Sequence, residues 1–330
     1  MRRFEMEIRT VTSPPSRRRA RATIALFVVT ILWGWTFVWM KQSLDAAERV
    51  LGRPGGVSVV ALYVAVRFAI AAALLTPWPR ARRGLDRGAW RGGFILGALL
   101  CAGFLVQMLG LQAVSPPVSA FLTSLYVAFA AILSTILRRA RPHFPFLAGV
   151  LLATFGAGFI QGPPHLTFGL AEGLTIVSAL LFALHILATD RITKAHAPLA
   201  VTIAMFAWTT ALSCAALLFA LVRQDAPGAG ELLVLIRDRG FVLPLLMATL
   251  FATIGALTLM NQFQRELDPI RAAILYAFEP IWTTLITFAS GFGAPGAWLW
   301  LGGGALLAGN LIAEWGAAHD TAPPPLAPEA

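Results

Sequence analysis

Charged side chains are scarce in this chain, at 13% of its 330 residues. A soluble domain carries about 25% charged residues, because its surface has to face water. Hydrophobic residues instead make up 58% of the chain, and the mean hydropathy is +0.73. So little polar surface cannot cover a globule in water. The composition therefore excludes a soluble enzyme or binding protein and indicates a protein of the membrane.

Cysteine is also scarce, and the common catalytic motifs are missing. Cys101 and Cys214 both fall inside apolar runs, where a free thiol behaves as a small buried hydrophobe. No His, Cys and carboxylate cluster has metal-ligand spacing, and no nucleotide-binding loop, Ser/His/Asp set or Gly-x-Ser-x-Gly elbow occurs. We therefore expect no metal, no cofactor and no intramembrane enzyme, and any transport must draw on ion or substrate gradients.

What the chain has in abundance is long apolar runs. A spanning helix needs about 20 mostly apolar residues, and its backbone must be hydrogen-bonded within the segment. These runs are too long and too uniformly apolar for barrel strands. The sequence predicts an all-α polytopic membrane protein with ten transmembrane helices, at 22–44, 57–78, 91–113, 117–137, 144–161, 169–189, 199–222, 241–262, 269–289 and 296–315. The first run exceeds a signal-peptide core and is expected to stay uncleaved.

The net charge of +10 is best explained by topology. If the N-terminus lies in the cytoplasm, 18 of the 26 Lys and Arg residues fall on the cytoplasmic side and six on the other. Cytoplasmic loops of membrane proteins carry this excess. We therefore expect a multi-pass protein of the bacterial inner (plasma) membrane, with both termini cytoplasmic. The basic residues then face lipid head groups and do not indicate nucleic acid.

The ten runs divide as five plus five, with a faint internal copy at an offset of about 150 residues. The clearest match joins 115–126 (SPPVSAFLTSLY) to 268–276 (DPIRAAILY). Five is an odd number, so the second half must be inverted relative to the first, which places a binding site near the midplane between the halves. The predicted organisation is a basic tail at 1–21, a repeat at 22–161, a linker at 162–168, a repeat at 169–315 and a Pro/Ala-rich tail at 316–330.

Several motifs in this order resemble the drug/metabolite transporter superfamily, EamA type. The motifs are 32–38 (LWGWTFV), Arg67-Phe68, 121–127 (FLTSLYV), 149–156 (GVLLATFG), Glu279-Pro280 and the glycines from Gly302 to Gly309. The resemblance covers about 22–315. It implies a ten-helix carrier that moves small metabolites, often amino acids or amphipathic compounds, usually outward.

Three ionisable side chains inside the predicted spans carry the main functional hypotheses, because such groups are costly in a bilayer. Glu279 either binds a substrate ammonium or takes up a proton, or else it braces the backbone opened by Pro280. Arg67 either attracts a substrate carboxylate or forms an internal ion pair. His185 is a second proton-coupling candidate, with a hydrogen-bonded packing role as its alternative.

Further polar and aromatic side chains could line a cavity together with Arg67 and His185, or could simply join helices by hydrogen bonds. These are Trp33, Thr36, Trp39, Gln107, Tyr126, Asn261, Gln262 and Tyr276. Lys41, Asp190 and Glu314 lie near helix ends, where a solvated position is favoured over a gate.

The resulting hypothesis is a secondary transporter that exports a small amino-acid-like or amphipathic metabolite by alternating access, driven by proton exchange. The alternatives are an uncoupled facilitator of small solutes and a membrane scaffold without flux. The expected partners are a small-molecule substrate, protons and the lipid bilayer. The chain would act as a monomer or a homodimer.

Overall fold

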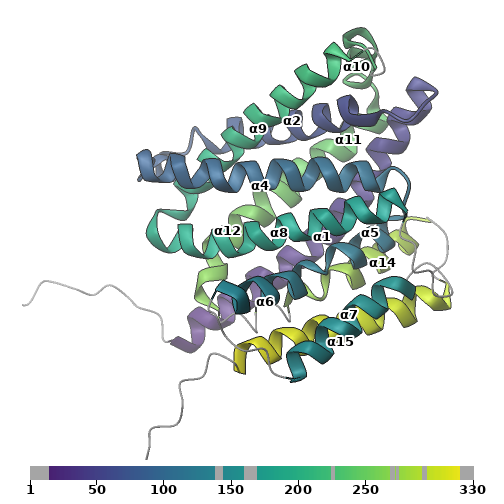
Figure 1. The fold of residues 1–330 in the computed structure, drawn as a ribbon. Helices are drawn as coiled ribbons and strands as arrows, with labels where there is room; N and C mark the ends of the chain where they lie inside the picture. Colours follow the sequence, from purple (N-terminus) through teal and green to yellow (C-terminus); the bar gives the residue numbers. More distant parts are fainter. Residues whose placement is uncertain are drawn as a thin grey trace, which may run out of the picture.

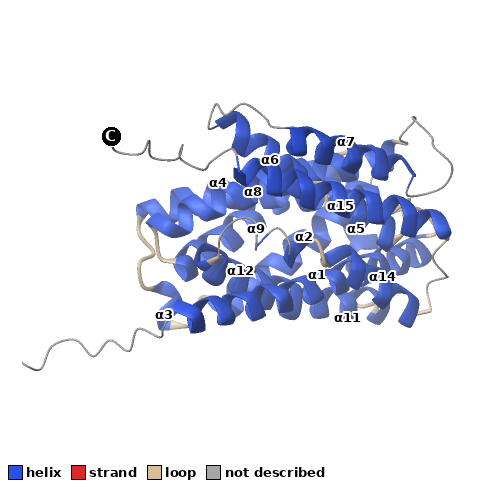
Figure 2. Cartoon of the chain, turned by 90° about the horizontal axis from the view of Figure 1, so that it is seen from below, coloured by secondary structure: helices blue, strands red, loops and turns tan. Residues whose placement is uncertain are grey.

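The computed structural model describes residues 15–137, 144–159, 169–223, 227–267, 272, 275–291 and 296–319. Within these ranges the regular structure is entirely helical (Figure 2). The helices are α1 Pro15–Leu51, α2 Gly56–Leu75, α3 Pro79–Arg82, α4 Arg87–Leu111, α5 Pro116–Thr123, α6 Tyr126–Leu137, α7 Phe144–Phe159, α8 Leu170–Ala195, α9 Pro198–Val222, α10 Ala229–Leu235, α11 Arg239–Met247, the π-helix η1 Ala248–Leu257, α12 Thr258–Phe263, the 3₁₀ helix η2 Gln264–Glu266, α14 Glu279–Ala289 and α15 Ala297–His319.

Seven described helices are long and apolar enough to cross a membrane, which confirms the all-helical membrane class. They cover Arg18–Leu51, Gly56–Leu75, Arg87–Leu111, Pro116–Leu137, Leu170–Ala195, Pro198–Val222 and Arg239–Glu266. Two shorter apolar helices, Phe144–Ala157 and Ala297–Ala313, match two more of the predicted runs. The run at 269–289 falls partly outside the described residues, and α14 forms its second part. The expected linker at 162–168 also lies outside them.

Proline and aspartate mark several helix starts, as their chemistry requires. Pro15 begins α1, so the helix starts seven residues before the predicted span and includes part of the expected basic tail. Proline suits this position because its missing N–H would be unpaired there in any case. Asp86 caps α4 by accepting from the Ala89 N–H at 2.7 Å, and Asp238 caps α11 through the Phe241 N–H at 2.9 Å.

The helix predicted at 117–137 is broken in the structure. Ser124 and Leu125 separate α5 from α6. Asn310 of α15 contacts the chain at this break, where its side-chain amide donates to the carbonyl oxygen of Ser124 at 2.8 Å. A similar turn at 277–278 precedes α14. The chain between α11 and α12 is wound as a π-helix over ten residues, a geometry that is rare and often found at functional sites.

Two groups of helices face each other, each built around one long helix. In the first, which we call the α1 group, α1 packs against α11, η1, α12, η2 and α14. In the second, the α8 group, α8 packs against α4, α5 and α6. The pair α2 and α9 packs on one flank, and α7 lies along α15 on the other (Figure 1). Gly34 allows the closest approach within the α1 group, since a Cβ there would meet the Trp282 Cβ at 2.7 Å.

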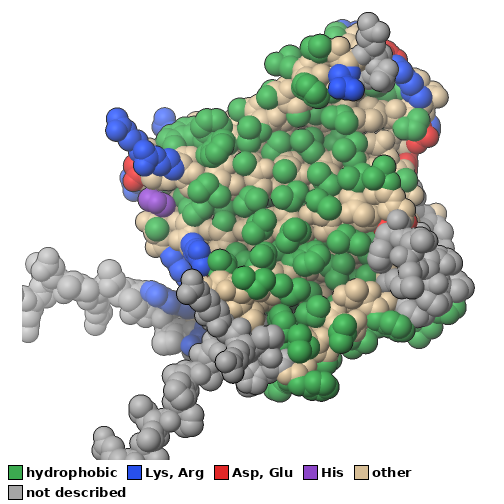
Figure 3. Space-filling view, viewed as in Figure 1, with side chains coloured by type: hydrophobic (Ala, Val, Ile, Leu, Met, Phe, Trp, Pro, Cys, Tyr) green, Lys and Arg blue, Asp and Glu red, His purple; other side chains and the backbone are tan. Residues whose placement is uncertain are grey.

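The surface agrees with a membrane setting. Large apolar side chains such as Leu151, Leu218 and Phe219 are well exposed on the helices. In Figure 3 the hydrophobic side chains cover the middle of the visible face, and the charged ones gather toward its two ends. The short helix α10 lies outside the long apolar segments. Its Glu231 has a pKa below the usual value, because the Gly228 N–H and then Arg53 donate to the carboxylate.

Candidate functional site

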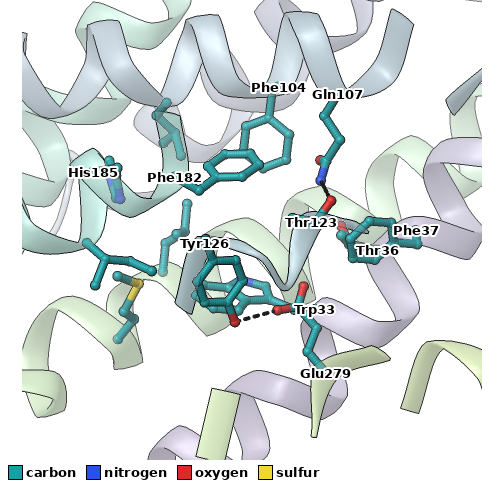
Figure 4. A pocket seen from close by; sticks show the side chains of 14 residues that line it. Trp33, Thr36, Phe37, Phe104, Gln107, Thr123, Tyr126, Phe182, His185 and Glu279 are labelled. Atoms are coloured by element: carbon teal, nitrogen blue, oxygen red, sulfur yellow. Dashed lines mark hydrogen bonds between the residues drawn. The ribbon is translucent and has the colours of Figure 1, made fainter. Parts of the chain in front are cut away.

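A cavity lies between the α1 and α8 groups. Its lining is mainly aromatic and aliphatic, with a few polar side chains, as is usual for small-molecule sites. The lining residues are Trp33, Thr36, Phe37, Leu100, Phe104, Gln107, Thr123, Tyr126, Phe182, His185, Ile186, Leu257, Met260 and Glu279 (Figure 4). Both groups contribute, so the cavity depends on how they are placed relative to each other.

Glu279 is the acidic side chain of this cavity, and it is 5% exposed. It stands at the first turn of α14, directly after the break at 277–278. The Tyr126 hydroxyl donates to the Glu279 Oε2 at 3.0 Å, across the boundary between the two groups (Figure 4). Among the described residues no group donates to the second carboxylate oxygen, which leaves an acceptor available to a donor in the cavity.

A neutral polar pair occupies another part of the wall. The Gln107 side-chain amide donates to the Thr123 Oγ1 at 3.1 Å, joining α4 to α5 (Figure 4). His185 projects from α8, and its Nε2 lies 3.4 Å from the sulfur of Met205. Hydroxyl, amide and imidazole groups can each donate or accept a hydrogen bond, so this wall can bind both donor and acceptor atoms of a ligand.

Arg67 lies just behind the cavity wall and is 1% exposed. Its guanidinium donates to the hydroxyls of Thr253 in η1 and Thr36 in α1, the latter at 3.3 Å. The guanidinium carbon also lies 4.6 Å from the centre of the Phe104 ring, a favourable cation–π position. Its Nη1 has no hydrogen-bond partner. Among the described residues no ion pair joins Arg67 to Glu279, so this buried charge has no internal counter-charge at contact distance.

Aromatic rings supply most of the remaining wall. Phe104 and Phe182 meet edge to face with their centres 5.5 Å apart. Tyr276 lies behind Trp33, with ring centres 5.7 Å apart, and donates to the Gln264 Oε1 at 3.1 Å. These contacts hold Trp33 and Phe104 in place, so the cavity has a shaped apolar surface.

The structure gathers many of the sequence candidates at one place. Trp33, Thr36, Gln107, Tyr126, His185 and Glu279 line the cavity, while Arg67 and Tyr276 lie one layer behind it. Three other candidates lie elsewhere. Trp39 stacks on Trp35 at 5.4 Å, Asn261 donates to the Thr202 hydroxyl of α9 at 2.8 Å, and Gln262 is not among the lining residues.

The candidates near helix ends do not line the cavity. Lys41 pairs with Asp45 at 3.3 Å, and Asp190 pairs with Lys194 at 2.7 Å, each within one helix. The side chain of Glu314 lies outside the described residues. In the described ranges no group of three His, Cys, Asp or Glu side chains could hold a metal ion.

Sequence reasoning missed the apolar half of the wall. Phe37, Phe104, Phe182 and Met260 carry no signal in the sequence, because such residues occur throughout every apolar run. For Phe104 and Phe182, only the helical face that they share with Gln107 and His185, three residues away, could have indicated them. Thr123 could have been noted as a hydroxyl inside the matched segment 115–126.

Fold and cavity together define a multi-pass helical membrane protein with an internal cavity. Comparison with known proteins points to a family. The model of the EamA-like transporter family matches residues 20–161. A protein of Archaeoglobus fulgidus, described as an uncharacterized transporter, is 26% identical over 273 residues, which are 82% of this chain and 79% of that protein. A solved crystal structure of a protein superposes with a TM-score of 0.56 at 18% identity, over 92% of this chain and 99% of that one.

These findings confirm the resemblance that the motifs indicated. Residues 20–161 match the EamA-like transporter family, and this match and the transporter relative together support an EamA-type permease of the drug/metabolite transporter superfamily. The crystal structure adds that the fold itself is shared across nearly the whole chain. The family match points to a transporter.

Proposed function

We propose that this protein exports a small amino-acid-like or amphipathic metabolite by alternating access, with proton exchange through Glu279. The observation that carries the proposal is the Glu279–Tyr126 hydrogen bond at 3.0 Å, which joins the two helix groups inside the cavity. A buried carboxyl group at a moving boundary can exchange a proton for a cationic substrate group. Export is the direction that the family resemblance implies.

We further propose ten spanning helices arranged as two inverted five-helix repeats. The packing of the helices supports this arrangement, because the contacts between the two proposed repeats recur with the repeats exchanged. If α1 corresponds to α8, and α4 to the α11–η1–α12 segment, the contact of α1 with η1 corresponds to that of α8 with α4. The contact of α1 with α14 corresponds to that of α8 with α6. Under the same correspondence, α2 packs against its own counterpart α9, and α7 packs against its own counterpart α15.

Individual glycines on α7 and α15 support the same symmetry. A Cβ on Gly156 would meet the Gly302 carbonyl oxygen at 2.6 Å and the Leu306 nitrogen at 2.3 Å. A Cβ on Gly309 would meet the Gly149 carbonyl oxygen at 2.6 Å and the Ala153 nitrogen at 2.2 Å. The two sets of positions differ by 153 residues throughout, so the two contacts are copies with the partners exchanged.

The same offset links the two breaks in the helices, at 124–125 and 277–278. It also makes Tyr126 the counterpart of Glu279, so the hydrogen bond of the cavity joins symmetry-related positions. The sequence match had aligned Tyr126 with Tyr276 instead, through their shared Leu-Tyr. We therefore place the proposed repeat axis beside the Tyr126–Glu279 bond.

The shape and polarity of the cavity support the substrate class. The mainly apolar lining with a few polar side chains suits a small molecule. Aromatic walls from Trp33, Phe104 and Phe182 favour an apolar or cationic body. Glu279 offers an acceptor for a substrate ammonium group. Arg67 lies behind the lining residue Thr36, and its Nη1, which has no partner among the described residues, offers a donor for a substrate carboxylate.

Orientation and location remain those inferred from charge. The excess of Lys and Arg beside the predicted cytoplasmic loops supports both termini in the cytoplasm of a bacterial cell. The C-terminal end of α1 then faces outward, and its N-terminal end faces the cytoplasm.

The test is uptake into inside-out vesicles with and without an imposed proton gradient. The panel contains labelled amino acids and one lipophilic cation, and the variant is Glu279→Gln. Glu48→Gln is the matched control, because it makes the same change on the exposed face of α1. We expect gradient-dependent accumulation in wild type and Glu48→Gln, and its loss in Glu279→Gln.

Other outcomes separate the alternatives. Equal flux with and without the gradient would indicate a facilitator. An unchanged pH profile in Glu279→Gln would remove Glu279 from coupling. The absence of flux for every compound, with protein shown to be folded, would favour the scaffold.

A further inference from the structure

One lysine joins the two helix groups at one end of the cavity. The Lys41 Nζ, on α1, donates to the carbonyl oxygens of Gln112 at 3.0 Å and Leu111 at 3.3 Å. Both carbonyls belong to the C-terminus of α4, where the last turn has no partners within the helix. A cation there also meets the negative end of the helix dipole. Asp45 lies 3.3 Å from the same ammonium and holds it in position.

A second cation joins the groups through another helix C-terminus. The Arg265 Nη1, on η2, donates to the Thr193 carbonyl oxygen in the last turn of α8 at 3.3 Å. The Gln264 side-chain amide beside it lies 3.4 Å from the carbonyl oxygen of Ile186. In both places the α1 group supplies the cation and the α8 group supplies the carbonyls.

The two contacts lie at opposite ends of the cavity. Helices α4 and α8 run antiparallel, since a Cβ on Gly110 would meet the Ala171 carbonyl oxygen at 2.6 Å and one on Gly88 would meet the His196 ring at 2.3 Å. Their C-termini are therefore far apart. Lys41 follows the lining residue Thr36 by five positions, and Arg265 follows Met260 by five. Each distance is about 7.5 Å along a helix.

The acidic and basic residues near these contacts stand in the opposite order in the two proposed repeats. At an offset of 149 residues, Lys41 corresponds to Asp190 and Asp45 to Lys194. Both couples form ion pairs within their own helix, at 3.3 Å and 2.7 Å. The cation of the first couple also crosses to the other group, whereas the bonds described for Lys194 stay within α8. Lys194 is therefore a natural control for Lys41.

We propose that Lys41 and Arg265 are the gate residues of this transporter, one at each end of the cavity. Each cation closes its end by holding the C-terminus of the opposite group. An end opens only when its cation releases the carbonyls, and alternating access requires that the other contact remain made. This inference rests on the proposed alternating-access function, and it adds the residues that control entry from each side.

The test measures access to the cavity and needs no known substrate. In a background with Cys101→Ser and Cys214→Ser, the lining residue Thr123 is replaced by cysteine as a reporter. A membrane-impermeant thiol reagent then labels it in right-side-out and inside-out vesicles. We expect Lys41→Leu to increase the labelling rate about fivefold from the Lys41 side only. Arg265→Leu should do so from the Arg265 side only, because each loses a charged hydrogen bond of the closed state.

Lys194→Leu should leave both rates at the wild-type value, and Lys41→Arg should keep the labelling rate near the wild-type value, because it retains the cation that Lys41→Leu removes. Equal changes from both sides, or changes no larger than those of Lys194→Leu, would overturn the proposal. If Lys41→Leu does not fold, Lys41→Gln takes its place, since it removes the charge and keeps a donor. Wild-type labelling in Lys41→Gln would overturn the role of the charge. Because labelling is independent of flux, failure of the gates and failure of the proposed substrate are seen separately.

Discussion

The contact between α7 and α15 allows a sharp prediction about stability, which compares two glycines on the same helix. Gly309 faces α7, and a Cβ there would lie 2.2 Å from the Ala153 nitrogen and 2.6 Å from the Gly149 carbonyl oxygen. Ordinary van der Waals contact begins at 3.4 Å. The obstructing atoms are backbone, so no rotamer change can make room. Gly304 on the same helix has nothing within 4 Å of its Cβ position.

We expect Gly309→Ala to be less stable than Gly304→Ala by about 1–3 kcal/mol, the usual cost of forcing extra volume into a packed contact. The two helices would have to separate by more than 1 Å at Gly309, taken from the difference between 3.4 Å and 2.2 Å. Both variants gain the same helix propensity from alanine, about 0.5–1 kcal/mol. That gain cancels when the two are compared, so the difference reports the contact alone.

The assay is reversible unfolding of purified protein in detergent, or thermal unfolding if refolding fails. The midpoint of each alanine variant is compared with that of wild type under one set of conditions. Gly156→Ala should behave like Gly309→Ala, because the Gly302 carbonyl oxygen and Leu306 nitrogen lie equally close to its Cβ position. If Gly309→Ala and Gly304→Ala unfold together, the close approach of α7 and α15 is refuted.

Two further predictions concern buried polar groups. Arg67→Met and Arg67→Lys should both lose transport, because neither side chain can donate to Thr36 and Thr253 while stacking on Phe104. Flux into vesicles measures this loss. Transport by Arg67→Lys would show that the positive charge alone suffices. Asn310→Ala should cost about 1 kcal/mol in unfolding experiments, since its amide donates to the carbonyl oxygen at the α5–α6 break. The exposed Thr154→Ala, whose hydroxyl bonds only within α7, should change stability by less than about 0.5 kcal/mol, and equal losses in the two variants would contradict the bracing role of Asn310.

Much of the candidate site could be predicted because ionisable and polar residues stand out in apolar runs. Glu279, Arg67 and His185 were singled out by their cost in a bilayer, and all three lie in or next to the cavity. The same reasoning also selected Trp39 and Asn261, which contact other partners. A buried polar side chain needs a hydrogen-bond partner, but that partner can be a neighbouring helix as well as a ligand.

The breaks in the helices show a second limit. The run 117–137 has uniform hydropathy and has no proline after its start, so its pattern predicts one continuous helix. The break at Ser124 is stable because Asn310, from a helix 186 residues away along the chain, takes over the freed carbonyl. The π-helix at 248–257 is likewise invisible in the sequence, and its Thr253 accepts a hydrogen bond from Arg67 of α2.

The sequence by itself determined the class of this protein, because bilayer solvation acts on each segment separately. Long runs without charge must become spanning helices, and the distribution of Lys and Arg sets their expected direction. Only the tertiary structure decided which faces of those helices meet. The cavity, the Glu279–Tyr126 bond and the carbonyl contacts of Lys41 all join segments distant in the chain. Lipid is as apolar as the helix surfaces, so hydropathy cannot select partners, and close packing and interhelical hydrogen bonds make that choice.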